Sequence, residues 1–165
     1  MLQSCPMTLE KENFLRTKLV PCLQRLNPAA TPRWGNMNVQ QMIEHLATDA
    51  VPCANGRLNI TDIVTPPEQL QRLREFMMSE KAFRENTKNP LMPEEPPVCV
   101  FKTIQGAVGA LQEELIYFFE VFEKNPALVT RNPFFGDLNF EQNVQLLYKH
   151  ALHHLRQFGA EPLVH

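Results

Sequence analysis

The sequence has 165 residues, of which 44% are hydrophobic and 21% are charged, a balance typical of a folded domain rather than a disordered chain. Its 16 basic and 18 acidic residues give a net charge of −2 without a basic stripe, so no nucleic-acid partner is expected. No apolar run in the sequence is long enough to cross a bilayer, which excludes a membrane-spanning helix.

The first helix is predicted over residues 8–26, where leucine and phenylalanine recur at steps of three and four. Pro28 ends it, because a residue before proline is pushed out of the helical conformation. The second helix is predicted to start after Asn38, which has Gln41 three positions later in the capping-box arrangement. Pro52 is expected to stop this second helix.

The third helix is predicted from Thr103 to Asn125 and has the clearest amphipathic pattern in the sequence. The fourth helix begins near Asn139, with Gln142 in the reciprocal capping position, and Gly159 supplies its C-terminal stop. Sustained alternation of apolar and polar residues is absent, so little or no sheet is expected.

The lengths of the connections predict how the helices are arranged. The first connection is about ten residues long and the last about a dozen, and both join antiparallel neighbours, whereas the middle one is about fifty, long enough to cross the bundle. An extra helix is predicted within the middle connection, over residues 67–83. The prediction is therefore an all-α fold, an up-down-down-up four-helix bundle with a long crossover between helices two and three, forming one domain over residues 1–165.

The cysteines favour a reducing compartment. They lie far apart and form no CxxC pair, and three of them sit in apolar stretches, where a free thiol behaves as a small hydrophobe. The start of the sequence shows no basic residues followed by an apolar run, so no signal peptide is expected and the prediction is a cytoplasmic protein. The four cysteines are Cys5, Cys22, Cys53 and Cys99.

The histidines of the fourth helix differ in the direction they face. With Leu147 at the centre of the apolar face, His154 lies about 20° away, His150 about 60° and His153 about 120°. His150 and His154 therefore point to the interior, one turn apart, at the spacing of histidine pairs in helical zinc sites. His153 points elsewhere, and His165 is set aside because it is the last residue of the sequence.

A third ligand is available on the second helix, where His45 flanks the apolar stripe about 60° from Met42. Polar flanks that face each other across a bundle are where such folds hold internal metal ions. Spacing alone leaves two interpretations open, a metal site or histidines that simply pack and form hydrogen bonds. For the metal site, Asp49 is the candidate catalytic or orienting residue, and the candidate cofactor-binding residues are Asn38, Gln41, Asn143 and Gln157.

Three segments resemble the DinB-like superfamily, in particular a subgroup catalogued as a domain of unknown function. They are residues 34–46 (WGNMNVQQMIEHL), 134–138 (FFGDL) and 150–159 (HALHHLRQFG), in the family's order along nearly the whole chain. The resemblance implies an up-down-down-up bundle and a divalent metal (zinc, nickel, iron or manganese). Its ligands would be one histidine of the second helix and the HxxxH pair of the fourth: His45, His150 and His154.

The resemblance also implies partners and a reaction class. Members are often homodimers, and some are transferases or isomerases that use a low-molecular-weight thiol such as mycothiol, bacillithiol or glutathione, whereas others are classed as hydrolases. The family's common HHRGQ ending reads HHLRQ at residues 153–157, so the ligand spacing is kept but the choice of thiol is not carried over.

The leading hypothesis is therefore a metalloenzyme that acts on a small molecule or thiol. The rivals are a non-catalytic binding or stress-response module with a structural or vestigial metal, a metal-free interaction bundle, and cysteine-based chemistry. A solvent-accessible coordination position, with a metal that a chelator removes without unfolding the chain, would favour the enzyme over the module. Metal analysis of untagged protein separates both from the metal-free bundle.

Overall fold

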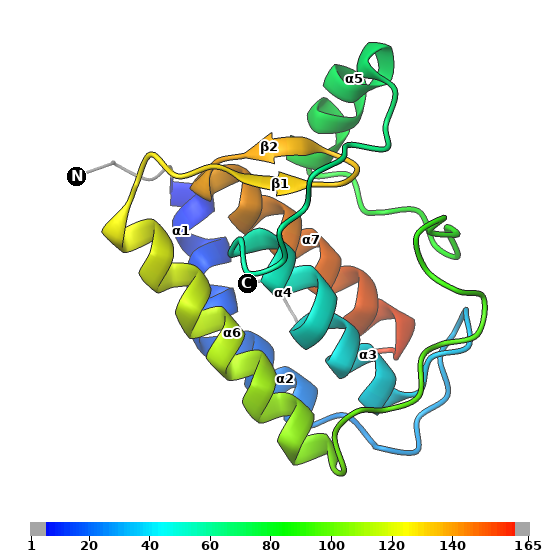
Figure 1. Ribbon diagram of the computed structural model, residues 1–165. Helices are drawn as coiled ribbons and strands as arrows, with labels where there is room; N and C mark the ends of the chain where they lie inside the picture. Colours follow the sequence, from blue (N-terminus) through cyan, green and yellow to red (C-terminus); the bar gives the residue numbers. More distant parts are fainter. Residues whose placement is uncertain (1–5, 161–165) are drawn as a thin grey trace.

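The computed structural model describes residues 6–160 and is mostly helical, with a small two-stranded sheet (Figure 1). Within those residues no helix combines the length and the apolar character needed to cross a bilayer. Cys5 and His165 lie outside the described residues. The helical segments are α1 (Pro6–Asn13), η1 (Phe14–Lys18), α2 (Leu19–Gln24), α3 (Val39–His45), η2 (Leu46–Ala50), α4 (Val51–Ala54), α5 (Pro67–Met78), α6 (Ile104–Lys124) and α7 (Phe140–Gln157).

The prediction that Pro52 stops the second helix is wrong, because α3, η2 and α4 follow one another without a break. In a regular α-helix a proline ring clashes with the carbonyl four residues earlier. That carbonyl belongs to Thr48, which lies in the π-helical turn η2, where the backbone bonds run from i to i+5. The Thr48 hydroxyl donates to the Glu44 carbonyl at 2.8 Å. Thr17 of η1 makes the same bond, at 2.9 Å, four residues before Pro21.

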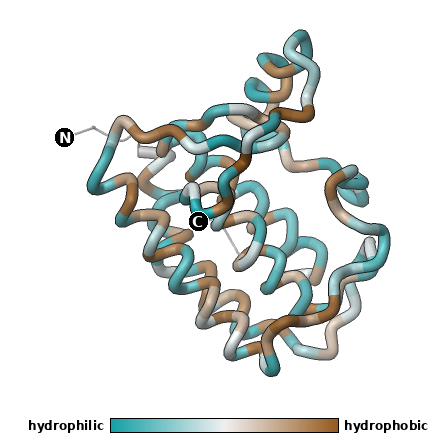
Figure 2. Tube along the Cα trace, in the orientation of Figure 1, coloured by the Kyte–Doolittle hydropathy of each residue, from teal (hydrophilic) through white to brown (hydrophobic). Residues whose placement is uncertain are grey.

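The long helices bury their apolar faces against one another, and Figure 2 shows apolar and polar residues alternating along them. Helix α6 contacts α2, α3 and α4, while α7 contacts α1 and α4. Phe118 of α6 is fully buried, and its ring stacks on Phe140 of α7 with centroids 5.8 Å apart. Burying one such side chain stabilises the fold by about 1.5–3 kcal/mol. This packing fixes the spacing between the α3 and α7 helices that carry the histidines.

Helix α5 lies in the middle connection, as predicted, although it ends at Met78 rather than at Phe83. Its C-terminal end docks on Lys149 of α7. The Lys149 Nζ donates to the carbonyl of Phe76 at 2.8 Å and to that of Ser79 at 3.1 Å. A cation at this end of a helix also interacts favourably with the helix dipole. Burial lowers the pKa of Lys149 to about 8, because the ammonium group loses hydration.

The end of the crossover lies along α3 and is held by its polar side chains. The Phe101 N–H donates to Glu44 Oε1 at 2.6 Å, and Gln40 Nε2 donates to the Phe101 carbonyl at 2.7 Å. Gln41 Nε2 donates to the Pro97 carbonyl at 3.1 Å. The long connection is therefore attached to both α7 and α3, the two helices that supply histidines.

The all-α prediction is corrected by a short hairpin between α6 and α7. Strands β1 (Thr130–Asn132) and β2 (Gly136–Leu138) pair antiparallel, with Thr130 opposite Leu138. The Asn132 carboxamide oxygen accepts the backbone N–H of Phe134 at 2.8 Å and that of Phe135 at 3.1 Å, and so shapes the turn. Three-residue strands are too short to show the two-residue alternation on which sequence prediction relies.

Candidate metal centre

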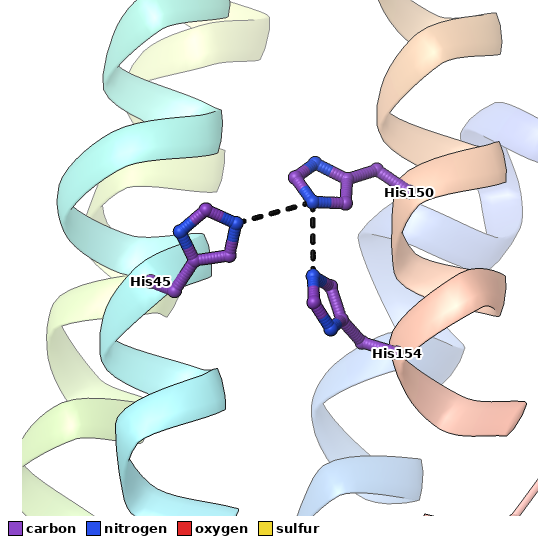
Figure 3. A group of neighbouring side chains, drawn as sticks. All are labelled: His45, His150 and His154. Atoms are coloured by element: carbon purple, nitrogen blue, oxygen red, sulfur yellow. Dashed lines mark hydrogen bonds between the residues drawn. The ribbon is translucent and has the colours of Figure 1, made fainter. Parts of the chain in front are cut away.

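Three histidines from two helices meet between α3 and α7 (Figure 3). His45 is the last residue of α3, and His150 and His154 lie one turn apart on α7. The His150 Nε2 atom lies 3.2 Å from His45 Nε2 and 2.9 Å from His154 Nε2. The structure therefore brings together the three residues that the sequence predicts as metal ligands.

The donor geometry fits a divalent cation. Tetrahedral zinc with Zn–N bonds of about 2.0–2.1 Å separates its ligand nitrogens by about 3.3–3.4 Å. The two Nε2 separations, 3.2 and 2.9 Å, are shorter than this by a few tenths of an ångström, which small side-chain rotations supply. One nitrogen of each ring lies within 4.8 Å of the other two. Imidazole donors suit zinc, nickel and iron, whereas manganese prefers oxygen ligands.

Loss of hydration keeps two of these imidazoles neutral. Loss of hydration, together with the nearby His45, lowers the pKa of His154 to about 3. Loss of hydration is also the main reason why the pKa of His150 lies well below its ordinary value, and the neighbouring histidines add to it. A neutral imidazole keeps a lone pair on one nitrogen, which is the form that binds a metal ion.

Asp49 lies beside the site, one turn after His45. Its Oδ2 atom is 3.0 Å from His45 Nδ1, and the side chain is 54% exposed. A carboxylate that accepts the Nδ1–H of a histidine directs the lone pair of Nε2 toward a metal ion. The structure therefore places Asp49 where the sequence predicts an orienting or proton-accepting group, in contact with both a ligand and solvent.

Gln157, the last residue of α7, is 4% exposed and contacts His154. Its Oε1 atom lies 2.8 Å from His154 Nδ1, and its Nε2 atom donates to the Trp34 carbonyl at 2.9 Å. The sequence predicts Gln157 as a residue lining the cofactor cavity, and the structure places it in contact with His154, a candidate ligand. The contact between Trp34 and Gln157 could not be predicted from the sequence, because Trp34 makes it with its backbone carbonyl rather than its side chain.

His153 lies outside the group of three, as its position on the helical wheel predicts. Its ring packs against Trp34, with centroids 5.2 Å apart, and against Phe83 at 6.3 Å. The His153 Nδ1 atom is buried without a hydrogen-bond partner. His153 is therefore part of the packing between α7, the loop before α3 and the crossover.

Asn38 and Gln41 form the N-terminal cap of α3. The Asn38 side chain accepts the Gln41 N–H at 2.8 Å, and the Gln41 side chain accepts the Asn38 N–H at 2.9 Å. The predicted capping box is thus confirmed, as is the one formed by Asn139 and Gln142 at the start of α7. This capping role sets where α3 begins and so where His45 lies, and the cofactor-binding role of Asn38 and Gln41 stays a prediction.

Asn143, also predicted to bind cofactor, is buried at the start of α7 and bonded to the hairpin. Its amide nitrogen lies 2.9 Å from Thr130 Oγ1, 3.1 Å from the Leu138 carbonyl and 3.0 Å from the Asn139 carbonyl. Thr130 in turn donates to the Ala54 carbonyl of α4 at 2.8 Å. The structure therefore gives Asn143 the role of joining β1, β2 and α4 to α7.

Asn143→Ala is expected to lower the free energy of unfolding by about 1–3 kcal/mol, because the buried acceptors around Asn143 lose their donor. Chemical denaturation of the metal-free protein measures this loss. The affinity for zinc should change less than about twofold, because no contact joins Asn143 to the three histidines. A large loss of zinc affinity in a folded variant would contradict this prediction and would show that Asn143 contributes to the cofactor site.

The described cysteines are free, as predicted, and cysteine-based chemistry finds little support. Cys53 of α4 is buried, and its Sγ lies 3.5 Å from the Arg131 carbonyl. Burial, followed by the charge of Asp49, raises the pKa of the Cys53 thiol to about 11. Since the thiolate is the nucleophile, this thiol is poorly reactive near neutral pH.

Comparison with known proteins gives no match, because no family model, curated protein or solved structure is significantly similar to this chain. The likeness to the DinB-like superfamily thus rests on the segments around the histidines and remains a prediction. The geometry of the three imidazoles is independent of that likeness.

Proposed function

We propose that this chain binds a divalent metal ion through His45, His150 and His154 and acts as a metalloenzyme of the DinB-like type. The observation that carries the proposal is the convergence of three Nε2 atoms from two helices. Two of the rings are held neutral by burial, so their lone pairs are available to the metal. Three protein ligands leave a coordination position for water or substrate, as in catalytic rather than structural zinc sites.

We also propose that the fold is an up-down-down-up four-helix bundle. The support is the course of the chain in Figure 1, where α1–α2 and α7 run one way and α3–α4 and α6 run the other. A parallel α4–α6 step needs a long connection, and residues 55–103 supply one. The likeness to the family further implies a homodimer, whose mass light scattering would measure, and the widely separated cysteines favour the cytoplasm.

The proposed reaction is of the thiol-dependent transferase or hydrolase type. A bound divalent cation would supply a Lewis acid that lowers the pKa of a water or thiol at its open position. His45, His150 and His154 would hold that cation as neutral ligands. The Asp49 carboxylate, half exposed and bonded to His45, would accept a proton from the solvent side of the site.

One observation favours the alternative, a non-catalytic binding or stress-response module in which the metal is structural. Two hollows, of about 640 and 700 Å³, lie along α6 beside η1 and α2, and neither is lined by a histidine. Substrate pockets usually enclose a large part of their ligand. Turnover, or its absence, with the metal-loaded protein decides between the enzyme and the module.

Elemental analysis of the protein purified without a histidine tag tests the metal site directly. We expect about one zinc, nickel, iron or manganese ion per chain, removable by a chelator without loss of helical circular dichroism. A thermal-shift screen with low-molecular-weight thiols then tests the substrate class. A thiol that raises the melting temperature only in the metal-loaded protein supports the thiol-dependent type. Metal below one tenth of an equivalent after zinc loading would overturn the proposal.

A further inference from the structure

The orientation of the Gln157 amide settles where the proton of His154 lies. The Trp34 carbonyl can only accept a hydrogen bond, so the Gln157 atom that faces it must be the NH₂ group. The carboxamide oxygen of Gln157 then faces His154 and can only accept. His154 must therefore carry its proton on Nδ1. Its Nε2 atom, the one that points at His150, is left with a free lone pair.

The loop before α3 is built to hold Gln157 in this orientation. The Arg33 N–H donates to the Gln157 backbone carbonyl at 2.7 Å, next to the bond between the Gln157 side chain and Trp34. Gly35 has a φ of +72°, and a Cβ added there would lie 3.3 Å from Gln157 Nε2. The glycine therefore allows the loop both its left-handed backbone and its close approach to the amide.

His45, His150 and His154 form a triad, and two of its members contact a hydrogen-bond acceptor through Nδ1. These two acceptors differ in charge. Asp49 is an anionic, half-exposed acceptor for His45, whereas Gln157 is a neutral, buried acceptor for His154. A neutral acceptor fixes the imidazole without placing a second negative charge beside the cation, so the cation keeps more of its Lewis acidity.

We propose that Gln157 is a positioning residue, held by the main chain of Arg33 and Trp34, which keeps the proton of His154 on Nδ1 and its Nε2 directed at the metal ion. This inference rests on the proposed metal site. Contacts of this kind to ligand histidines typically contribute 10–100-fold to metal affinity.

The test compares Gln157→Met with Gln145→Met in the full chain, with zinc affinity measured by competition against a coloured chelator. Methionine keeps the size of glutamine and removes its hydrogen bonds. Gln145 is a matched control, because it is buried on the same helix but bonds Lys11 and the carbonyls of Met77 and Ser79. We expect zinc affinity to fall 10–100-fold for Gln157→Met and to change less than about twofold for Gln145→Met.

Nitrogen-15 NMR of the imidazoles gives a second readout, in which His154 should show a protonated Nδ1 and a zinc-bound Nε2. If Gln157→Met does not fold, Gly35→Ala replaces it, with Gly56→Ala as its control, because Gly56 also has a positive φ but faces Thr130. Tight zinc binding by both Gln157→Met and Gly35→Ala, or zinc on Nδ1 of His154, would overturn this inference and leave the metal site standing. Failure of the natural chain to bind zinc would overturn both.

Discussion

Replacing His150 with alanine is expected to abolish stoichiometric metal binding, and the same result is expected for His45→Ala and His154→Ala. Each variant leaves only two imidazoles around the cation, and the His150 Nε2 is the atom that lies closest to both of the others. The zinc affinity should fall more than about 100-fold, beyond the range found when an outer contact of a ligand is removed. Metal content per chain after zinc loading and desalting measures the effect.

His153→Ala is the matched control, since it removes an imidazole one residue away from a ligand. Its ring packs against Trp34, Phe83 and the edge of His154, but it supplies no nitrogen to the group of three, so the variant should retain about one metal ion per chain. Circular dichroism in chelator shows whether each variant is folded. Equal losses from all four variants, or no loss from any, would contradict the assignment of the three ligands.

The helix boundaries that follow from local chemistry were predictable. Asn38, Thr103 and Asn139 all cap helices, because each side chain bonds a backbone amide within the first turn and this requires only nearby residues. The continuation through Pro52 was not predictable, since it depends on the π-helical turn before it. The β1–β2 hairpin was missed because its strands are only three residues long.

The same distinction applies to the candidate site. The directions of the fourth-helix histidines were predictable, because two residues four apart share a helix face whatever surrounds them. The distance between α3 and α7 was not predictable, because it depends on packing around α6. Gln157, which contacts His154, and Asn143, which bonds the hairpin, could not be distinguished from the sequence, since both are polar residues on the same flank of the helix.

The long connection supports the candidate metal site. Lys149 and His153 flank His150 on α7, and both contact the segment that follows α5, Lys149 through the Ser79 carbonyl and His153 through the Phe83 ring. The loop before α3 contacts the C-terminal end of α7, where the Trp34 carbonyl accepts a bond from Gln157. The triad is thus supported on both sides by irregular segments, whose positions local sequence patterns do not determine.

The metal-free protein is expected to lose about 2–3 kcal/mol of stability between pH 7.5 and pH 5.5, because the half-buried His150 and the buried His154 lose hydration on folding and stay neutral. Loss of hydration is the main reason why the pKa values of both histidines are lower in the folded chain than in the unfolded chain. It lowers the pKa of His154 to about 3. An unfolded histidine has a pKa of about 6.5. Below that pH the unfolded chain binds more protons than the folded one, so protons favour unfolding. This contribution to stability is fully present above pH 6.5 and is lost as the pH falls toward the folded pKa values.

Urea unfolding in the presence of chelator, at the two pH values, measures this loss. The double variant His150→Leu/His154→Leu is the control. It removes these two bases and keeps His153, whose pKa burial also lowers, so its stability should change by no more than about half as much over the same interval. Carboxylates titrate mostly below this range, so they add little to the difference. A drop of the same size in the double variant would assign the acid sensitivity to other groups. Equal stability of the natural chain at both pH values would mean that the imidazoles are hydrated rather than buried between α3 and α7.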